Sequence, residues 1–328
     1  MARITIIGAG ITGMSIAYVL SRNHDITIVA KNLPGDKPTI DWASPWAGAS
    51  FIAGGCSSAD EVRMQRDTFA ELWRLSVSRP ESSVKQVFAE DFHDDKTKDD
   101  IWWKDFMPEV SSTPSPLLCH KTLILNPDVF LPWFKTELER TGVRFERMEL
   151  KSLSDARNRG HDVLINATGF GSLNLQDVQD QNMQMIRGQT ALVKSSLKQL
   201  LMHDNGETYT YAIPRLDGTV ILGGTRDTDS KSPDIDSNQV NDIFKRINEH
   251  LPDQFSANPS DHEIVRHNVG IRPSRLGGVR VEKEERDGQN IVHAYGVPGG
   301  GYIFGFGVAR AARDLVEEIL FSSPKPRL

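Results

Sequence analysis

The chain has 328 residues, of which 38% are hydrophobic and 25% are charged, and its formal net charge is −6. These values are typical of a globular protein with two domains or one large α/β unit. The negative charge argues against the basic surface of a nucleic-acid-binding protein. No apolar run reaches the roughly 18 residues of a transmembrane helix, so no membrane partner is expected. Cys56 and Cys119 lack metal-site spacing, and we expect both to be reduced.

The N-terminal residues predict a βαβ unit. Residues 3–7 are apolar and β-branched, as in a buried parallel strand. A glycine-rich turn follows at 8–13, and apolar residues then recur at helical spacing over 14–21. Residues 26–29 are predicted to form the second strand of this unit.

The turn after the first strand has the pattern Gly-x-Gly-x-x-Gly, with Ile11 and Thr12 before the last glycine. Gly8 permits a tight turn, Gly10 lets the backbone approach a pyrophosphate, and Gly13 allows the helix to pack closely on the strand. The phosphate would lie against the free N–H groups of the helix N-terminus. The pattern therefore predicts nucleotide binding; the alternative is a tight turn of an unrelated α/β protein.

The end of the second strand departs from the dinucleotide pattern. An acidic residue is expected about 20 residues after the glycines, but the sequence there is Ala30-Lys31-Asn32. Either Lys31 or Asn32 contacts the ribose or phosphate, or this contact is absent. The departure favours a flavin protein with a variant site over an NAD-dependent dehydrogenase. Lys31 could also be a solvated residue at the strand end.

The remaining pattern predicts an α/β fold with a second domain inserted into the nucleotide domain. Helices are predicted at 59–76, 126–141, 237–250 and 304–320, and strands at 143–145, 163–166, 186–193, 208–224 and 291–295. Residues 88–116 are charged and turn-rich. We assign residues 1–50, 140–180 and 285–328 to the nucleotide domain, and 51–139 and 181–284 mainly to an antiparallel-sheet domain.

Four further segments together resemble the D-amino-acid oxidase and D-aspartate oxidase family of FAD-dependent enzymes. They are the small-residue loop 43–49 (ASPWAGA), Arg187-Gly188-Gln189-Thr190, the segment 267–275 (HNVGIRPSR), and 293–302 (HAYGVPGGGY). The resemblance implies a Rossmann-type FAD-binding domain with an inserted antiparallel-sheet substrate domain, and FAD as the cofactor.

The resemblance also implies which residues contact FAD. Small residues in the loop 43–49 let backbone N–H groups reach the cofactor, and a helix N-terminus near Phe304 could stabilise negative charge on the reduced flavin. The predicted cofactor residues are Gly8, Gly10, Ile11, Thr12, Gly13, Lys31, Asn32, Ala43, Ser44, Ala47, Gly48, Ala49, Gly169, Gly299, Gly300, Gly301, Tyr302 and Ile303.

Three residues are predicted to hold the substrate backbone. Arg272 would bind the α-carboxylate with its planar fork, and the hydroxyl of Tyr211 would add a hydrogen bond to the same group. The carbonyl of Gly299 could accept from the amine. The alternatives are a structural ion pair for Arg272, a cross-strand aromatic pair for Tyr211, and a glycine hinge at 299. We expect Arg275 to be structural.

Arg226 carries the prediction of substrate preference. By resemblance, broad-specificity D-amino-acid oxidases have an aromatic residue at this position, whereas D-aspartate oxidases have arginine. A second arginine would pair with a side-chain carboxylate, and a neutral substrate would leave its charge unpaired. The alternative is an ion pair with Asp227 or Asp229. The segment 228–236 departs from the family at the pocket rim, because it lacks the tryptophan that is common there.

The expected function is oxidative deamination of D-amino acids by dioxygen to 2-oxo acids, ammonia and hydrogen peroxide, with a lean toward D-aspartate and D-glutamate. The alternatives are a broad-specificity neutral D-amino-acid oxidase, a glycine- or sarcosine-type oxidase, an NAD-dependent dehydrogenase, and a non-catalytic flavoprotein. The preference for the D enantiomer rests on the resemblance alone.

The terminal Pro326-Arg327-Leu328 is similar to a peroxisomal address. A peroxide-forming reaction fits that compartment, so we expect peroxisomal localisation through the peroxisomal import receptor. A frayed terminus of a cytoplasmic protein is the alternative. A homodimer also stays open, although residues 280–290 are too short for one built on a long loop.

Overall fold

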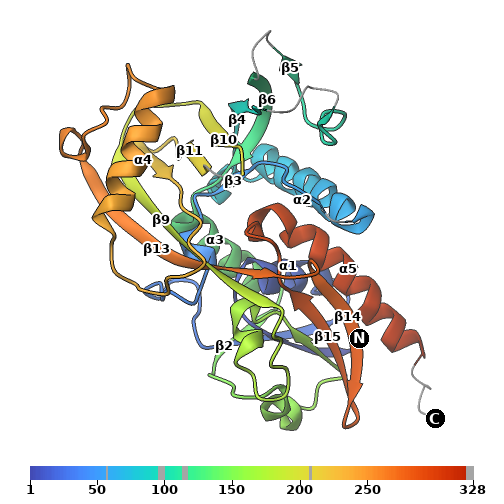
Figure 1. The fold of residues 1–328 in the computed structure, drawn as a ribbon. Helices are drawn as coiled ribbons and strands as arrows, with labels where there is room; N and C mark the ends of the chain where they lie inside the picture. The colour runs from blue at the N-terminus through green and yellow to red at the C-terminus, as the bar shows by residue number, and fades with distance from the viewer. Residues whose placement is uncertain (57, 95–99, 113–116, 207–208, 323–328) are drawn as a thin grey trace.

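The computed structural model describes residues 1–56, 58–94, 100–112, 117–206 and 209–322. Two β-sheets form the framework of the molecule, with helices packed between and outside them (Figure 1). Among the described helices, none combines the length and the apolar character needed to cross a bilayer. The terminal tripeptide lies outside the described residues, so its role stays a prediction.

The first sheet has six strands in the order β14-β15-β8-β1-β2-β7. Its central strands are parallel and short, and their β-branched residues are buried on both faces, as the sequence pattern predicts. Only β14 runs antiparallel, at one edge. The bounds are β1 (Arg3–Ile7), β2 (Asp25–Ala30), β7 (Arg144–Arg147), β8 (Val163–Asn166), β14 (Arg280–Arg286) and β15 (Gln289–Tyr295).

The second sheet follows the order β13-β9-β12-β11-β10-β4-β6-β3, and β5 also pairs with β6. Its neighbours are antiparallel except for the parallel pair of β10 and β4. The bounds are β3 (Ser50–Phe51), β4 (Lys85–Phe92), β5 (Ser111–Ser112), β6 (Leu117–Ile124), β9 (Met183–Lys194), β10 (Leu200–Asp204), β11 (Tyr209–Pro214), β12 (Thr219–Gly223) and β13 (Ile264–Arg275).

The charged, turn-rich segment 88–116 begins inside a strand that was not predicted, because β4 continues to Phe92. Val87, Ala89 and Asp91 alternate with more exposed residues in this strand and point into the protein. Asp91 is buried with two histidines, one of which, His93, lies 3.1 Å from its carboxylate. Because Asp91 is charged although it is buried, the sequence of β4 lacks the alternation of apolar and polar residues that marks a strand.

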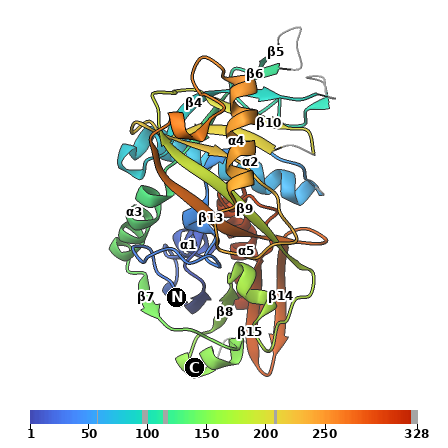
Figure 2. The same ribbon diagram turned by 60° about the vertical axis from the view of Figure 1, so that its left-hand side comes forward.

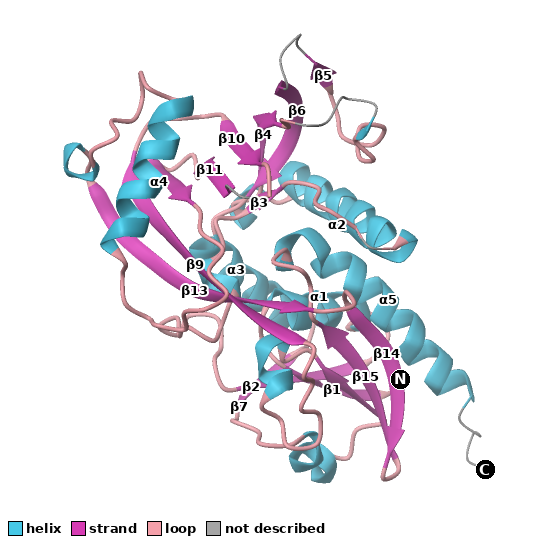
Figure 3. Ribbon diagram, in the orientation of Figure 1, coloured by secondary structure: helices cyan, strands magenta, loops and turns pink. Residues whose placement is uncertain are grey.

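In the described part of the chain, five α-helices surround the sheets. Figure 3 shows α4 on the outer side of the second sheet, and α1 and α5 side by side next to the first. Their bounds are α1 (Ile11–Leu20), α2 (Ala59–Ser78), α3 (Pro127–Arg140), α4 (Ser237–His250) and α5 (Gly301–Ser322). Short 3₁₀ helices lie at Ser44–Trp46, Pro80–Ser82, Leu153–Arg159, Gly169–Leu173 and Pro259–Asp261.

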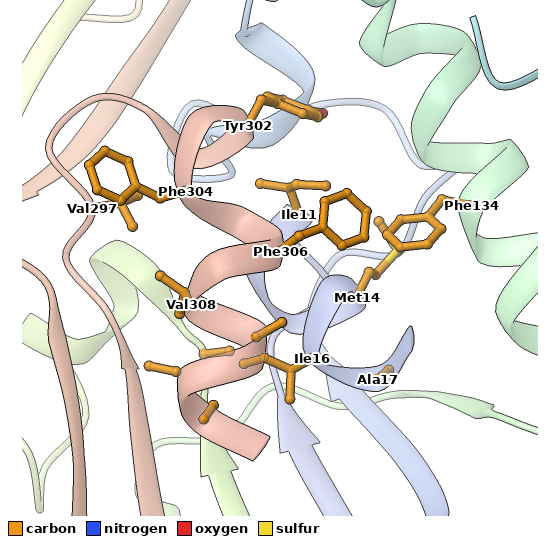
Figure 4. Packing of buried hydrophobic residues seen from close by; sticks show 14 of the residues in the cluster. Ile11, Met14, Ile16, Ala17, Phe134, Val297, Tyr302, Phe304, Phe306 and Val308 are labelled. Carbon is orange, nitrogen blue, oxygen red and sulfur yellow. The ribbon is translucent and has the colours of Figure 1, made fainter. Parts of the chain in front are cut away.

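A shared core joins α1, α3 and α5. Ile11 and Met14 of α1 face Phe306 of α5, and Phe134 of α3 packs against the same ring (Figure 4). This core anchors the N-terminal ends of α1 and α5, which are the ends directed at the cavity described below. α2 packs on α5 and α3 packs on α1, although both helices come from the segment 51–139.

The crossing of α2 and α5 depends on one glycine. A Cβ atom at Gly307 would lie less than 3.0 Å from the backbone of Met64, closer than real Cβ atoms approach. The N–H of Gly307 also donates to the hydroxyl of Thr68 at 2.9 Å. The two helices therefore touch backbone to backbone at this point.

The longest strands, β9 and β13, pair along their whole lengths and extend from the second sheet to the first (Figure 2). At the far end, the Nε of Arg275 donates to Asp180 at 2.8 Å, and the hydroxyl of Tyr295 in β15 donates to the same carboxylate at 2.9 Å. Arg275 thus has the structural role expected for it.

Candidate active site

One cavity of about 1100 Å³ runs from the glycine turn after β1 to Arg226. It exceeds the roughly 300–1000 Å³ of common small-molecule pockets, so it has room for a dinucleotide and a substrate. Every residue predicted to contact cofactor or substrate lines it, with the exception of Gly13. The segments named in the sequence therefore converge on one space.

The glycine turn has the geometry of an anion site. Gly8 has φ +114°, and a Cβ atom there would lie less than 3.0 Å from the carbonyl of Ala167. Gly10 precedes α1 without capping it through a side chain, and the N–H of Ile11 donates to Ser44 Oγ at 3.0 Å. A Cβ atom at Gly13 would lie less than 3.0 Å from the carbonyl of Gly8, so Gly13 shapes the turn from behind.

Lys31 and Asn32 line the cavity at the end of β2, and the side chain of each has a protein partner. Lys31 Nζ lies 3.0 Å from Glu149, whose hydrogen bond and charge raise the pKa of Lys31. Asn32 Nδ2 donates to the hydroxyl of Thr39 at 3.1 Å. The acidic residue that the dinucleotide pattern places at the end of β2 is absent, and the carboxylate near this position belongs to Glu149, which follows β7.

The loop 43–49 is fixed by two buried side chains. The hydroxyl of Tyr302 donates to the carbonyl of Ser44 at 3.1 Å, and Nε of Arg215 donates to the carbonyl of Gly48 at 3.3 Å. Arg215 is buried and forms an ion pair with Asp128 at 3.0 Å. Because the hydroxyl of Tyr302 bonds to this loop, Tyr302 positions the loop as well as lining the cavity.

The glycine-rich segment 296–301 leads directly into α5, which begins at Gly301 rather than near Phe304 as predicted. Gly299 has φ +64°, and its N–H donates to the carbonyl of Val297 at 2.8 Å. The N-terminus of α5 therefore lies at the cavity wall, where its partial positive charge favours an anionic group. Together with the N-terminus of α1, this wall fits a flavin dinucleotide.

Arg272 is placed by the pairing of β13 with β9. Gly270 lies opposite Gly188 in this register, so Gly188 is the diagonal neighbour of Arg272. A Cβ atom at Gly188 would lie 2.6 Å from Nη2 of Arg272. The guanidinium therefore rests on the bare backbone of β9, and its Nη1 donates to the carbonyl of Thr225 at 2.8 Å.

Tyr211 is buried in β11 beside Arg272. Burial raises the pKa of Tyr211 to about 12, although the charge and the hydrogen bond of Arg272 act in the opposite direction. The hydroxyl is therefore protonated near neutral pH and can donate a hydrogen bond. Cβ atoms at Gly223 or Gly224 would lie less than 3.0 Å from the ring, so this glycine pair makes room for it.

Arg226 pairs with neither of the two acids considered from the sequence. The Asp227 carboxylate accepts the N–H groups of Asp229 and Ser230. Arg226 instead forms a two-pronged ion pair with Asp204, with Nη1–Oδ1 at 2.9 Å and Nη2–Oδ2 at 2.6 Å. Asp204 lines the cavity and was not predicted, because its only signal is the pairing of β10 with β11.

The glycine under Arg272 gives a direct test of this arrangement. We expect Gly188→Ala to fold, because the new methyl meets the mobile end of a side chain, but to displace the guanidinium. KM for every amino-acid substrate should rise about tenfold or more, since a small misplacement of a binding group is costly. Gly305→Ala, whose methyl would meet side-chain atoms of Ile11 and Ser15 at 3.3 Å and which does not line the cavity, is the control. A normal KM in Gly188→Ala would contradict the placement of Arg272.

Comparisons with known proteins agree with this geometry. The profile of the DAO family, described as FAD dependent oxidoreductase, matches residues 3–315. A D-amino-acid oxidase of Fusarium vanettenii is 31% identical, over 96% of this chain and 97% of its own. A D-aspartate oxidase of Talaromyces thermophilus is 28% identical, over 96% and 95%. The solved glycine oxidase of Geobacillus kaustophilus shares the fold, with TM-score 0.73 and 16% identity over 97% and 95%.

The profile match covers nearly the whole chain, and the cavity carries two helix N-termini and a close backbone turn where a flavin dinucleotide needs them. The alternative of an NAD-dependent dehydrogenase is therefore wrong, and FAD is the cofactor. No group of three metal-ligating side chains occurs among the described residues. The chain belongs to the DAO family of FAD dependent oxidoreductases.

Proposed function

We propose that this protein oxidatively deaminates D-amino acids and accepts acidic ones, D-aspartate and D-glutamate, in preference to neutral ones. The proposal rests on one observation, which is that the guanidinium groups of Arg226 and Arg272 both lie near the ring of Tyr209. The guanidinium carbon of Arg226 lies 4.1 Å from the ring centre of Tyr209, and that of Arg272 lies 5.7 Å from it. An amino acid with two carboxylates has one group for each arginine.

Different residues of the cavity bind different groups of the substrate. Arg272 and the protonated hydroxyl of Tyr211 hold the α-carboxylate, and the carbonyl of Gly299 accepts from the amine. Bound FAD supplies the two-electron acceptor. The substrate amine is oxidised to an imine, which water hydrolyses to a 2-oxo acid and ammonia, while dioxygen is reduced to hydrogen peroxide. The names of the two fungal relatives support both D-amino-acid and D-aspartate substrates.

The first experiment measures oxygen consumption and peroxide release with D-aspartate, D-glutamate, D-alanine, glycine, sarcosine and the L enantiomers. We expect the D-amino acids to be oxidised and D-aspartate to be the best substrate. Faster oxidation of glycine or sarcosine would favour a glycine-type oxidase. An absence of peroxide with every substrate would leave a non-catalytic flavoprotein.

Arg226 is tested by Arg226→Gln. The variant should lose about 10- to 100-fold in kcat/KM for D-aspartate relative to D-alanine, because a hydrogen bond between charged groups contributes about 1.5–3 kcal/mol. Arg266→Gln is the matched control. Arg266 is a similarly exposed arginine, it pairs with Asp128 at 2.6 Å, and it does not line the cavity. Equal losses on both substrates would contradict a role in side-chain recognition.

We further propose that the protein acts in peroxisomes. The similarity of the terminal Pro326-Arg327-Leu328 to an import address and the release of peroxide both support this location. Removal of the last three residues should shift a fluorescent fusion of the chain to the cytoplasm.

A further inference from the structure

The side-chain end of the cavity contains a charge that the proposed function does not use. Asp204 is the last residue of β10, and Arg226 follows β12, two strands away in the sheet. Both line the cavity, and the two oxygens of Asp204 accept from the two terminal nitrogens of Arg226. This is the parallel fork by which an arginine recognises any carboxylate.

Both partners are ionised near neutral pH. Partial burial opposes the charge of Asp204, but the hydrogen bonds and charge of Arg226 hold the pKa of its carboxyl below the usual value. Asp204 likewise raises the pKa of Arg226 against the effect of burial. The pair therefore presents nearly no net charge to a substrate side chain, although an arginine stands at the position.

Arg226 has a second contact besides its ion pair with Asp204. Its guanidinium stacks on the ring of Tyr209, and Tyr209 lies in β11 directly opposite Asp204. A cation stacked on an aromatic face is held by the ring as well as by its ion pair. Removal of the Asp204 charge should therefore leave Arg226 in place with its fork open.

We propose that Asp204 is a specificity-determining residue, which competes with the substrate's side-chain carboxylate for the fork of Arg226. The inference rests on the proposed function. An incoming carboxylate must displace Asp204 or bind beside it against its negative charge, and either route weakens the attraction of Arg226. Asp204 thus occupies the position on Arg226 that the side-chain carboxylate of a bound D-aspartate would take. The enzyme therefore discriminates less strongly against neutral substrates.

The test compares selectivity in Asp204→Asn, Arg226→Gln and the double variant. Asp204→Asn should raise the ratio of kcat/KM for D-aspartate to that for D-alanine about tenfold. Arg226→Gln leaves Asp204 unpaired, so it should raise the ratio for D-lysine to D-alanine, and the double variant should lose this gain. Asp94→Asn is the matched control, because Asp94 pairs with His203 at 2.9 Å and does not line the cavity.

The outcomes separate this inference from the proposed function. If Arg226→Gln lowers the D-aspartate ratio but Asp204→Asn leaves it within twofold, the competition is wrong and the acidic preference stands. A lower ratio in Asp204→Asn would mean that Asp204 positions Arg226, which also overturns the inference. Unchanged ratios in all variants would overturn the acidic preference as well, and a wild type inactive on every D-amino acid would overturn the proposed function itself.

Discussion

Arg272→Met should reduce kcat/KM for every amino-acid substrate by about 10²- to 10³-fold or more. Removal of one partner of a hydrogen-bonded charge pair costs about 2–5 kcal/mol, and tenfold corresponds to about 1.4 kcal/mol. Tyr211 would remain, but a single neutral hydroxyl cannot replace a two-pronged cation. Steady-state kinetics with D-aspartate and D-alanine measure the effect.

The loss in Arg272→Met should be equal for acidic and neutral substrates, unlike that in Arg226→Gln, because the α-carboxylate is common to both. The flavin absorbance of the purified variant should stay normal, since Arg272 is not among the residues expected to bind FAD. Arg266→Met is the control for the loss of an arginine on β13. Retention of kcat/KM within threefold would show that Arg272 does not bind the substrate.

Gly307→Ala should destabilise the protein by about 3 kcal/mol or more and lower Tm by about 6 °C or more. Overpacking of a dense core costs roughly 1–3 kcal/mol and more where backbone must move. Here the new methyl would meet the backbone of Met64, so α2 must shift as a whole. The gain in helix propensity from alanine, about 1 kcal/mol, offsets only part of this.

Gly305→Ala, in the same helix, is the matched control for Gly307→Ala. A Cβ atom there would meet Ile11 and Ser15 at 3.3 Å, side-chain atoms that can give way. We expect its Tm to stay within a few degrees of the wild type. Thermal unfolding followed by circular dichroism measures both variants, and similar Tm values for the two would contradict the tight crossing of α2 and α5.

Local patterns predicted much of this fold. The β1–turn–α1 unit and the amphipathic α4, which Asp236 caps, follow from periodicity and turn chemistry within a few residues of the chain. The resemblance added the segments around Arg272 and Gly299. In contrast, β4 and β10 carry charged or polar residues at inward or terminal positions, and such strands lack a clean alternating pattern.

The features missed at the site are those that depend on strand register. Nothing near Gly188 in the sequence shows that it lies under Arg272, because 84 residues and several strands separate them (272 − 188). The Asp204–Arg226 pair likewise requires β10, β11 and β12 to lie side by side. The sequence predicts residues that line the cavity, whereas the register and order of the strands determine which charged side chains lie next to one another.

The ion pair of Arg275 with Asp180 has a mechanical consequence. The side chain of Arg275 also lies under Gly296, where an added Cβ atom would come within 2.7 Å of it. Arg275 thus packs β13, the strand that carries Arg272, against the turn 296–301. The position of Arg272, three residues before Arg275 on β13, is therefore coupled to that of the turn 296–301, and these two walls of the cavity should keep a fixed separation.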